Sequence, residues 1–203
     1  MQAARGTPLT PSGHSGPEAR DPGVPVTTPS RRRLRLLLAL VALAAYSVDV
    51  VTKTFAMRHL DGREPVELIG PVLRLTLVRN PGAAFSTGTS STVALTLLAA
   101  AAVVVVLVLA RRVGTRGWAV ALGLLLGGVS GNLTDRMLRD PAPLRGHVVD
   151  FLQLPHWPVF NVADICINLA AALIIWHSWR GVPLRGRRPQ TDGSEETGEG
   201  AGS

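Results

Sequence analysis

A run of 18 residues without a charged side chain lies in the middle of the chain: Val93-Ala-Leu-Thr-Leu-Leu-Ala-Ala-Ala-Ala-Val-Val-Val-Val-Leu-Val-Leu-Ala110. About 20 helical residues cross the hydrocarbon core of a bilayer, so this run and its polar flanks are long enough to span it. Arg111 and Arg112 follow directly and end the run. The stretch therefore predicts a transmembrane helix and places the chain among membrane proteins.

Three further apolar runs lie on either side of this one, at residues 34–51, 117–134 and 159–179. The composition agrees with four spans, because 46% of the 203 residues are hydrophobic and only 17% are charged, with a mean hydropathy of +0.26. An ordinary soluble domain carries more charge than this. We predict an all-α membrane protein with four transmembrane helices.

The first apolar run allows a second interpretation. It opens with Arg31-Arg-Arg-Leu-Arg35 and contains Ala42-Leu-Ala44, a combination that resembles a removable export signal with its cleavage site. However, the apolar stretch continues past that site into Asp49-Val-Val-Thr-Lys53. An uncleaved helix with functional groups at its far end explains this continuation better.

The arginines beside the four runs predict the orientation of the chain. Eleven lie on the side that holds both termini, and seven, spread over longer loops, lie on the other side. Because an excess of positive charge marks the cytoplasmic side, we expect a multi-pass protein of the plasma membrane with both termini in the cytoplasm. Residues 1–30 and 183–203 are expected to be disordered cytoplasmic tails around a four-helix domain at residues 31–182.

The region between the first two runs predicts short strands. Residues 66–69 and 73–78 are apolar with partial alternation, and a Gly-Pro pair separates them. Asn80-Pro-Gly82 then has the composition of a turn. We expect a small extracytoplasmic β-element over about residues 63–86, lying on the membrane surface. Residues 137–158 contain four prolines and are expected to form a loop.

Four aspartates fall near the outer ends of the predicted helices: Asp49, Asp135, Asp150 and Asp164. A carboxylate close to hydrocarbon is costly to keep charged, so acids at this depth indicate a functional site. Two carboxyl groups placed close together do not both ionise readily, so one keeps its proton while the other acts as a base. This pairing is the chemical basis of aspartic-protease catalysis.

Other chemistries fit the sequence less well. The five histidines lack the spacing of a His-Glu-x-x-His zinc site, so we expect no metal and no other cofactor. Lys53, the only lysine, has no serine clearly beside it for a Ser–Lys dyad, and is expected to pair with a carboxylate or a lipid phosphate. The net charge of +7 does not indicate a nucleic-acid partner, because the basic residues cluster beside apolar runs.

Two other functional classes stay open at this point. Acids within a membrane often mark the ion pathway of a transporter or channel subunit, although no inverted repeat or interrupted helix pair is visible. Gly127 and Gly131 form a Gly-x-x-x-Gly motif, which permits the close helix packing of a structural assembly factor. Such a factor would not need paired acids, so the aspartate pair remains the favoured chemistry.

Five short motifs follow one another along the chain. They are Asp49-Val-Val-Thr-Lys53, Asn80-Pro-Gly-Ala-Ala-Phe85, Gly127-Gly-Val-Ser-Gly-Asn-Leu-Thr-Asp-Arg136, Gly146-His-Val-Val-Asp-Phe151 and Phe160-Asn-Val-Ala-Asp164. Together they resemble the lipoprotein signal peptidases (signal peptidase II), and the resemblance covers about residues 34–180. Each motif is short, and it is the occurrence of all five in register that makes the resemblance specific.

The resemblance implies that residues 31–182 form a membrane-embedded aspartic endopeptidase. It would remove signal peptides from diacylglyceryl-modified prolipoproteins by cleaving before the lipidated cysteine, without a cofactor or metal. Its partners would be these lipid-modified substrates and membrane lipids. We expect a monomer with its active site near the outer face of the membrane.

The resemblance also assigns the catalytic pair to Asp150 and Asp164, whereas the residues alone do not exclude Asp135. Arg136 follows Asp135 and is expected to be its ion partner, which makes Asp135 a structural acid. Asn161 is expected to cap the helix that carries Asp164. The residues that would bind substrate or orient the pair are Asp49, Lys53, Asn80, Gly82, Asn132, Asp135, Arg136 and Asn161.

Overall fold

The structure is a computed structural model that describes residues 30–82 and 88–186. In chain order the described elements are α1 (Arg31–Leu60), β1 (Val66–Ile69), β2 (Leu73–Asn80), α2 (Gly88–Ala110), α3 (Arg116–Leu138), β3 (Val148–Gln153) and α4 (Val162–Trp179). Of the two tails predicted to be disordered, residues 1–29 and 187–203 lie outside the described residues. Residues 183–186 are described, and there Leu184 packs against the apolar core and its carbonyl oxygen accepts a hydrogen bond from the Gly114 N–H at 2.8 Å.

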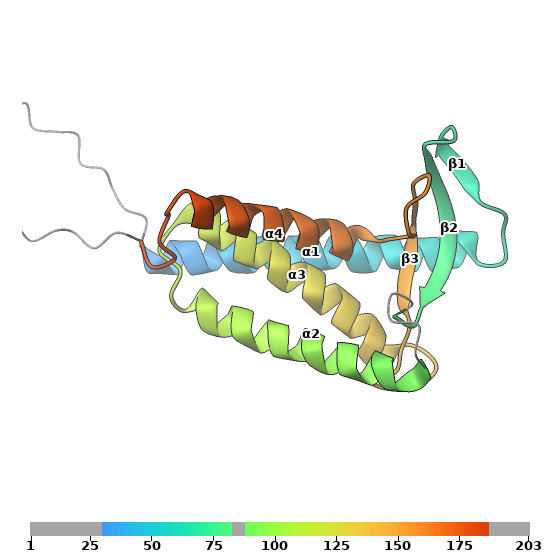
Figure 1. Ribbon diagram of the computed structural model, residues 1–203, viewed down its shortest axis with the longest axis horizontal. Helices are drawn as coiled ribbons and strands as arrows, with labels where there is room; N and C mark the ends of the chain where they lie inside the picture. The colour runs from blue at the N-terminus through green and yellow to red at the C-terminus, as the bar shows by residue number, and fades with distance from the viewer. Residues whose placement is uncertain (1–29, 83–87, 187–203) are drawn as a thin grey trace, which may run out of the picture.

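The helices run along one another, and the sheet crosses one end of them (Figure 1). Each of the four helices in the described part of the chain is long and apolar enough to cross a membrane, which confirms the predicted spans. The start of α1 and the end of α4 lie together at the end opposite the sheet (Figure 1). Helix α1 continues to Leu60, beyond its apolar run, and reaches the level of the sheet.

Glycines allow α3 to lie unusually close to its neighbours. A Cβ on Gly127 would stand 2.6 Å from the carbonyl oxygen of Ala42 in α1, and one on Gly128 would stand 2.7 Å from that of Ala163 in α4. A Cβ on Gly131 would collide with the Asp49 carboxylate. The close helix packing predicted from the Gly-x-x-x-Gly motif is confirmed, and α3 is the central helix of the bundle.

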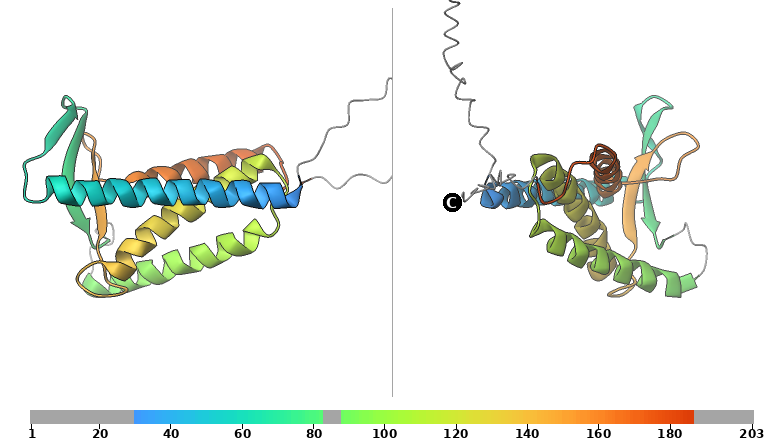
Figure 2. Two further views of the ribbon diagram at one scale, coloured as in Figure 1. Left: turned by 180° about the vertical axis from the view of Figure 1, so that it is seen from behind. Right: turned by 60° about the vertical axis from the view of Figure 1, so that its left-hand side comes forward.

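Helix α2 packs on α3 at the edge of the bundle, as both views of Figure 2 show. The apolar core that it shares with α1 and α3 lies toward the end opposite the sheet and includes Leu38, Val106 and Leu122. Many of the remaining apolar side chains of α2 are exposed, among them Leu98 and Val104. Such a surface suits contact with lipid rather than water.

The sheet is antiparallel with the strand order β1-β2-β3. Strands β1 and β2 confirm the predicted β-element as far as Asn80. The expectation of a loop over residues 137–158 is wrong in part, because residues 148–153 form β3, which pairs with β2 so that Val78 faces Asp150. The free edge of β2 supplies the hydrogen-bond partners that stabilise this short Val-Val-Asp-Phe-Leu-Gln strand.

Candidate active site

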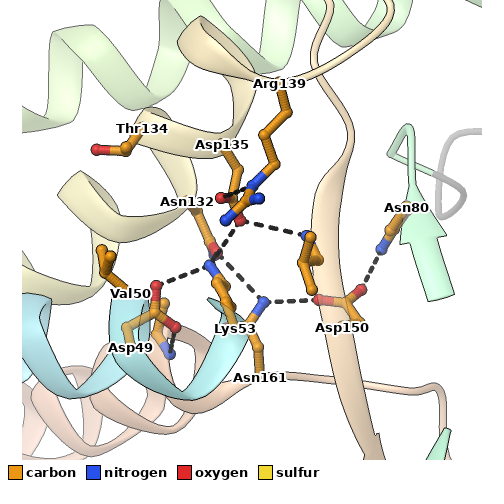
Figure 3. A network of polar contacts seen from close by, with 12 residues as sticks. Asp49, Val50, Lys53, Asn80, Asn132, Thr134, Asp135, Arg139, Asp150 and Asn161 are labelled. Atoms are coloured by element: carbon orange, nitrogen blue, oxygen red, sulfur yellow. Dashed lines mark hydrogen bonds and ion pairs between the residues drawn. The ribbon is translucent and has the colours of Figure 1, made fainter. Parts of the chain in front are cut away.

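Polar side chains from α1, α3, α4, β2 and β3 meet at the end of the bundle that the sheet covers (Figure 3). Most of them are removed from solvent. Asp49, Lys53 and Asn161 have no exposed surface, while Asp135 and Asp150 are each 2% exposed. The fold thus brings positions from residue 49 to residue 164 to one depth, where unpaired charges would be very costly.

Asp150 lies at the centre of β3, and both of its carboxylate oxygens accept hydrogen bonds. Asn80 Nδ2 donates to Oδ2 at 2.8 Å, and Asn161 Nδ2 donates to Oδ1 at 2.6 Å. Burial raises the pKa of Asp150 to about 6, and the charge of Asp164 adds to this increase, while the two amide hydrogen bonds act against it. Asp150 therefore holds its proton more readily than an ordinary aspartate.

Asp164 lies in the first turn of α4, where its carboxylate takes part in a reciprocal cap. The backbone N–H of Asn161 donates to Asp164 Oδ2 at 3.2 Å, and the N–H of Asp164 donates to Asn161 Oδ1 at 3.0 Å. The predicted capping role of Asn161 is confirmed. The positive end of the helix dipole favours a negative charge at this position.

Two asparagine side chains connect the two acids. Asn132 Nδ2 donates to Asp164 Oδ1 at 2.9 Å, and Asn161 Nδ2 reaches Asn132 Oδ1 at 3.2 Å in addition to Asp150. Asp150 and Asp164 are therefore held from β3 and α4 by one continuous set of amide hydrogen bonds.

Lys53 is buried beneath this amide pair. Its Nζ lies 2.7 Å from Asp49 Oδ2 and 2.9 Å from Asp135 Oδ2, and it donates to Asn132 Oδ1 at 2.8 Å. The expectation that Lys53 pairs with a carboxylate is confirmed. Arg139 forms a second ion pair with Asp135, so two acids and two bases balance one another in the cluster.

The predicted ion pair between Asp135 and Arg136 is wrong. The ion-pair partners of Asp135 in the described chain are Lys53 and Arg139. Successive residues of a helix point in different directions, whereas residues four apart share a face. Arg139 was missed by the sequence reasoning, although its i,i+4 spacing from Asp135 on a helix was a signal that could have found it.

Asp49 and Asp135 also bind backbone. The N–H of Ala163 donates to Asp49 Oδ1 at 2.8 Å, and the N–H of Val149 donates to Asp135 Oδ2 at 3.2 Å. Ala163 precedes Asp164, and Val149 precedes Asp150. These two buried acids therefore fix the backbone next to each member of the predicted catalytic pair, which agrees with a structural role for Asp135.

The remaining predicted residues border the acids. Gly82 donates its backbone N–H to Asn80 Oδ1 at 2.8 Å, and its φ of +108° is a conformation that glycine adopts readily. Arg136 is half-buried and lies near enough to Asp150 and Asp164 to interact with their charges. Its buried Nη1 has no hydrogen-bond partner among the described residues.

The described residues contain no group of three or more His, Cys, Asp or Glu side chains that could hold a metal ion. The site contains a carboxyl pair, of which Asp150 is buried and Asp164 partly exposed, supported by amides and by an adjacent, charge-balanced cluster. Such a pair can hold one proton between two carboxyl groups and so present an acid and a base to a substrate at the same time.

Comparisons with known proteins show which family the chain resembles. The family model of signal peptidase (SPase) II matches residues 41–180. A lipoprotein signal peptidase of Mycobacterium avium (strain 104) is 46% identical over 191 residues, which cover 93% of this chain and 100% of that protein. A lipoprotein signal peptidase of Mycobacterium tuberculosis (strain ATCC 25618 / H37Rv) is 46% identical over 173 residues, covering 83% of this chain and 85% of that protein.

The fold also has solved counterparts. A bacterial membrane enzyme determined by the in meso method at 1.9 Å resolution superposes with a TM-score of 0.63 and 26% identity, covering 70% of this chain and 91% of that one. A second, at 2.3 Å resolution, has a TM-score of 0.62 and 24% identity. From the family match over most of the bundle and the extent of the similarity to its relatives, the chain belongs to the signal peptidase II family.

Proposed function

We propose that this protein is a membrane aspartic endopeptidase that removes signal peptides from prolipoproteins, with Asp150 and Asp164 as its catalytic pair. Membership of the signal peptidase II family supports the reaction. The observation that supports the pair is the continuous hydrogen-bonded connection from Asp150 through Asn161 and Asn132 to Asp164. That connection fixes two carboxyl groups from different elements at one site.

The surroundings of the two acids suggest their roles in the attacking step. Burial raises the pKa of Asp150 to about 6, which favours Asp150 as the acid of the pair. Asp164 accepts hydrogen bonds from the Asn132 amide and from the Asn161 backbone N–H at the N-terminus of α4. We assign it the role of the base.

The reaction then needs one water and the two carboxyl groups. Asp164 takes a proton from the water, whose oxygen attacks the carbonyl carbon that precedes the diacylglyceryl-modified cysteine. Asp150 donates its proton to the carbonyl oxygen as the tetrahedral intermediate forms. The proton on Asp164 then passes to the peptide nitrogen, while the ionised Asp150 takes a proton back from a hydroxyl group of the intermediate and the C–N bond breaks. The signal peptide carboxyl group and the new amine are released, and Asp150 again carries the proton of the pair.

The neighbouring residues would serve binding and orientation. Arg136 Nη1 is a buried donor with no partner in the described chain, so it is suited to a carbonyl of the substrate backbone. The turn that contains Asn80 and Gly82 borders Asp150 and would form one wall of the pocket. Asp49, Lys53 and Asp135 would keep α1, α3 and α4 in register beneath the pair.

We place the site near the outer face of the plasma membrane and both termini in the cytoplasm, because eleven arginines flank the end of the spans that holds the termini and seven the other. The exposed apolar helix faces would contact membrane lipids, and the acyl chains of the substrate would remain in the bilayer. A monomer without nucleic acid or cofactor is sufficient for this chemistry.

Cleavage of a defined substrate tests the proposal. The full chain is purified in detergent and incubated with a prolipoprotein signal peptide that carries a diacylglyceryl-modified cysteine, and with the same peptide lacking the lipid. We expect hydrolysis only of the lipidated peptide, at the bond before the modified cysteine, as read by mass spectrometry. Hydrolysis at another bond, or no hydrolysis by folded protein, would contradict the proposed function.

A further inference from the structure

The residues labelled in Figure 3 all lie outside α2, yet α2 is hydrogen-bonded to two segments that lead to Asp150. Thr92 Oγ1 donates to the carbonyl oxygen of Pro81 at 2.8 Å, and Thr96 Oγ1 donates to that of Leu144 at 2.9 Å. Thr92 is 3% exposed and Thr96 is fully buried. Two threonines four residues apart thus direct one face of α2 at the turn after β2 and at the loop before β3.

The contact of Thr92 controls a particular peptide group. The carbonyl of Pro81 and the N–H of Gly82 belong to the same planar peptide unit, so fixing one fixes the direction of the other. The Gly82 N–H donates to Asn80 Oδ1 at 2.8 Å. This bond requires the Asn80 amide to present its oxygen, and not its nitrogen, to Gly82.

The same orientation is the one that serves Asp150. With its oxygen on Gly82, Asn80 presents Nδ2 to Asp150 Oδ2 at 2.8 Å. The turn is also packed directly on α2, since a Cβ on Gly82 would stand 2.5 Å from Leu95 Cδ1. The chain of contacts from α2 to the acid is therefore short and made of rigid groups.

We propose that Thr92 is a positioning residue of the catalytic pair, whose hydroxyl fixes the Pro81–Gly82 peptide plane and thereby keeps the Asn80 amide on Asp150. This inference rests on the proposed catalytic role of Asp150. Thr92 itself touches neither Asp150 nor the place of the substrate carbonyl. It acts through the turn, and α2 becomes a part of the catalytic apparatus as well as a membrane span.

The contact has a consequence for the titration of Asp150. The charged groups around this acid are Asp164 on α4, Lys53 on α1 and Arg136 on α3. The Asn80 hydrogen bond favours the ionised form and lowers the pKa of Asp150 against the effect of burial. When the Pro81–Gly82 peptide is no longer fixed, the hydrogen bond from Asn80 to Asp150 weakens. The pKa of Asp150 then rises, and the limb of the pH–rate profile that it governs moves to higher pH.

The test compares Thr92→Val, which keeps the shape and removes the hydroxyl, with Thr92→Ser, which keeps the hydroxyl. Thr54→Val is the matched control, because the Thr54 hydroxyl donates to the Val50 carbonyl within α1. We measure kcat and KM on the lipidated peptide across pH, and the thermal unfolding midpoint. We expect Thr92→Val to lower kcat about tenfold with KM unchanged, and to move the pH-profile limb governed by Asp150 to higher pH. Thr92→Ser should keep both kcat and the position of that limb close to their wild-type values.

Several results would overturn the inference. One is a Thr92→Val variant whose kcat and pH profile match those of Thr54→Val. Another is a loss of thermal stability without any movement of the pH limb, which would assign Thr92 to folding. Thr92→Ala is made in parallel. If neither Thr92→Val nor Thr92→Ala folds, Thr92 is likewise assigned to folding and the inference fails. Asp150→Asn distinguishes failure of this inference from failure of the proposed function. If Asp150→Asn is inactive while Thr92→Val has normal activity, only the role of Thr92 is refuted. If Asp150→Asn is active, the proposed function is refuted.

Discussion

Asp150 and Asp164 are held by amide groups that present hydrogens to both carboxylates. Asn161 and Asn80 donate to Asp150, while Asn132 donates to Asp164. Carboxylates held in this way cannot rotate away from one another, so the cost of orienting them is met when the protein folds and not during each turnover. At the scale of single residues, the site is specified by hydrogen-bond polarity as much as by charge.

The first prediction concerns the pair itself. Asp150→Asn and Asp164→Asn keep the size of each side chain and remove its ability to ionise. Because the two acids act as a unit, each single change should lower kcat by about a thousandfold or more, and the double variant should be little worse than either one. The measurement is hydrolysis of the lipidated peptide by purified variants. Losses that multiply in the double variant would show that the acids act independently.

The second prediction follows from the pKa of Asp150, which burial raises to about 6, whereas an unfolded aspartate has a pKa of about 4. As pH rises from about 4 to about 6, the unfolded chain loses this proton first, so the free energy of unfolding of the wild type falls. Asp150→Asn lacks this decline. Between pH 4 and pH 7 its free energy of unfolding, taken relative to that of the wild type, should therefore rise by up to about 3 kcal/mol.

Thermal unfolding midpoints in detergent, measured across that pH range, check this sign. Asp61→Asn is the control, because Asp61 is exposed and Arg79 holds its pKa below the ordinary value. The unfolding midpoint of the Asp61 variant should not rise relative to that of the wild type as pH increases. A constant difference between Asp150→Asn and the wild type at all pH values would contradict the raised pKa of Asp150.

At the scale of elements, the buried ion cluster acts as a joint between α1, α3, β3 and α4. Lys53 on α1 pairs with Asp135 on α3, and the two acids of the cluster bind the backbone N–H groups of Val149 and Ala163. A cluster of this kind contributes little when complete, but leaves buried charges without partners when one member is removed. Its members are therefore expected to affect folding more than a surface ion pair does.

The third prediction concerns the cost of removing one member of the buried ion cluster. Lys53→Met leaves Asp49 without its base and Asp135 with Arg139 alone, so it should lower the free energy of unfolding by about 3–5 kcal/mol. Asp135→Asn should cost less, because Lys53 keeps Asp49. Arg74→Met, which breaks the exposed Arg74–Glu67 pair, is the control and should cost below about 1 kcal/mol. Equal folded yields for all three variants would refute the role of the cluster.

Most of the elements could be predicted from the sequence, because spans and hairpins leave local signals. The uncharged run at residues 93–110 and the apolar segments around Gly70 are such signals. Strand β3 could not be predicted in the same way, since its stability comes from β2, about 70 residues earlier in the chain. The partner of Asp135 was predicted wrongly for a related reason: sequence adjacency suggested Arg136, whereas helix geometry selects Arg139.

At the scale of the whole molecule, the sheet and the polar cluster lie at one end of the bundle and the start of α1 and the end of α4 at the other (Figure 1). The motifs of the sequence predicted which residues gather at this end, but not how they are joined. Whether an amide oxygen or nitrogen faces a given acid depends on contacts between distant elements. Lys53 on α1, for example, binds the oxygen of Asn132 on α3, which leaves the Asn132 nitrogen to face Asp164. No local pattern encodes that choice.

The fourth prediction concerns orientation in the membrane. In a Cys166→Ala background, Leu68→Cys on the exposed hairpin should react with an impermeant maleimide added to intact cells. Arg112→Cys, in the turn between α2 and α3, should react only after the cells are opened. The reverse labelling pattern would place the active site on the cytoplasmic side and refute the proposed topology.

The side chain at position 132 has a consequence for which sequences the site can tolerate. Its oxygen accepts from Lys53 at 2.8 Å and its nitrogen donates to Asp164 at 2.9 Å. Aspartate would offer Asp164 an acceptor instead of a donor, leucine would offer neither group, and glutamine would extend the amide beyond both partners. Only an asparagine can satisfy an ammonium on one side and a carboxylate on the other at this distance. The buried lysine therefore restricts position 132 to a single amino acid, although Lys53 itself need never meet the substrate.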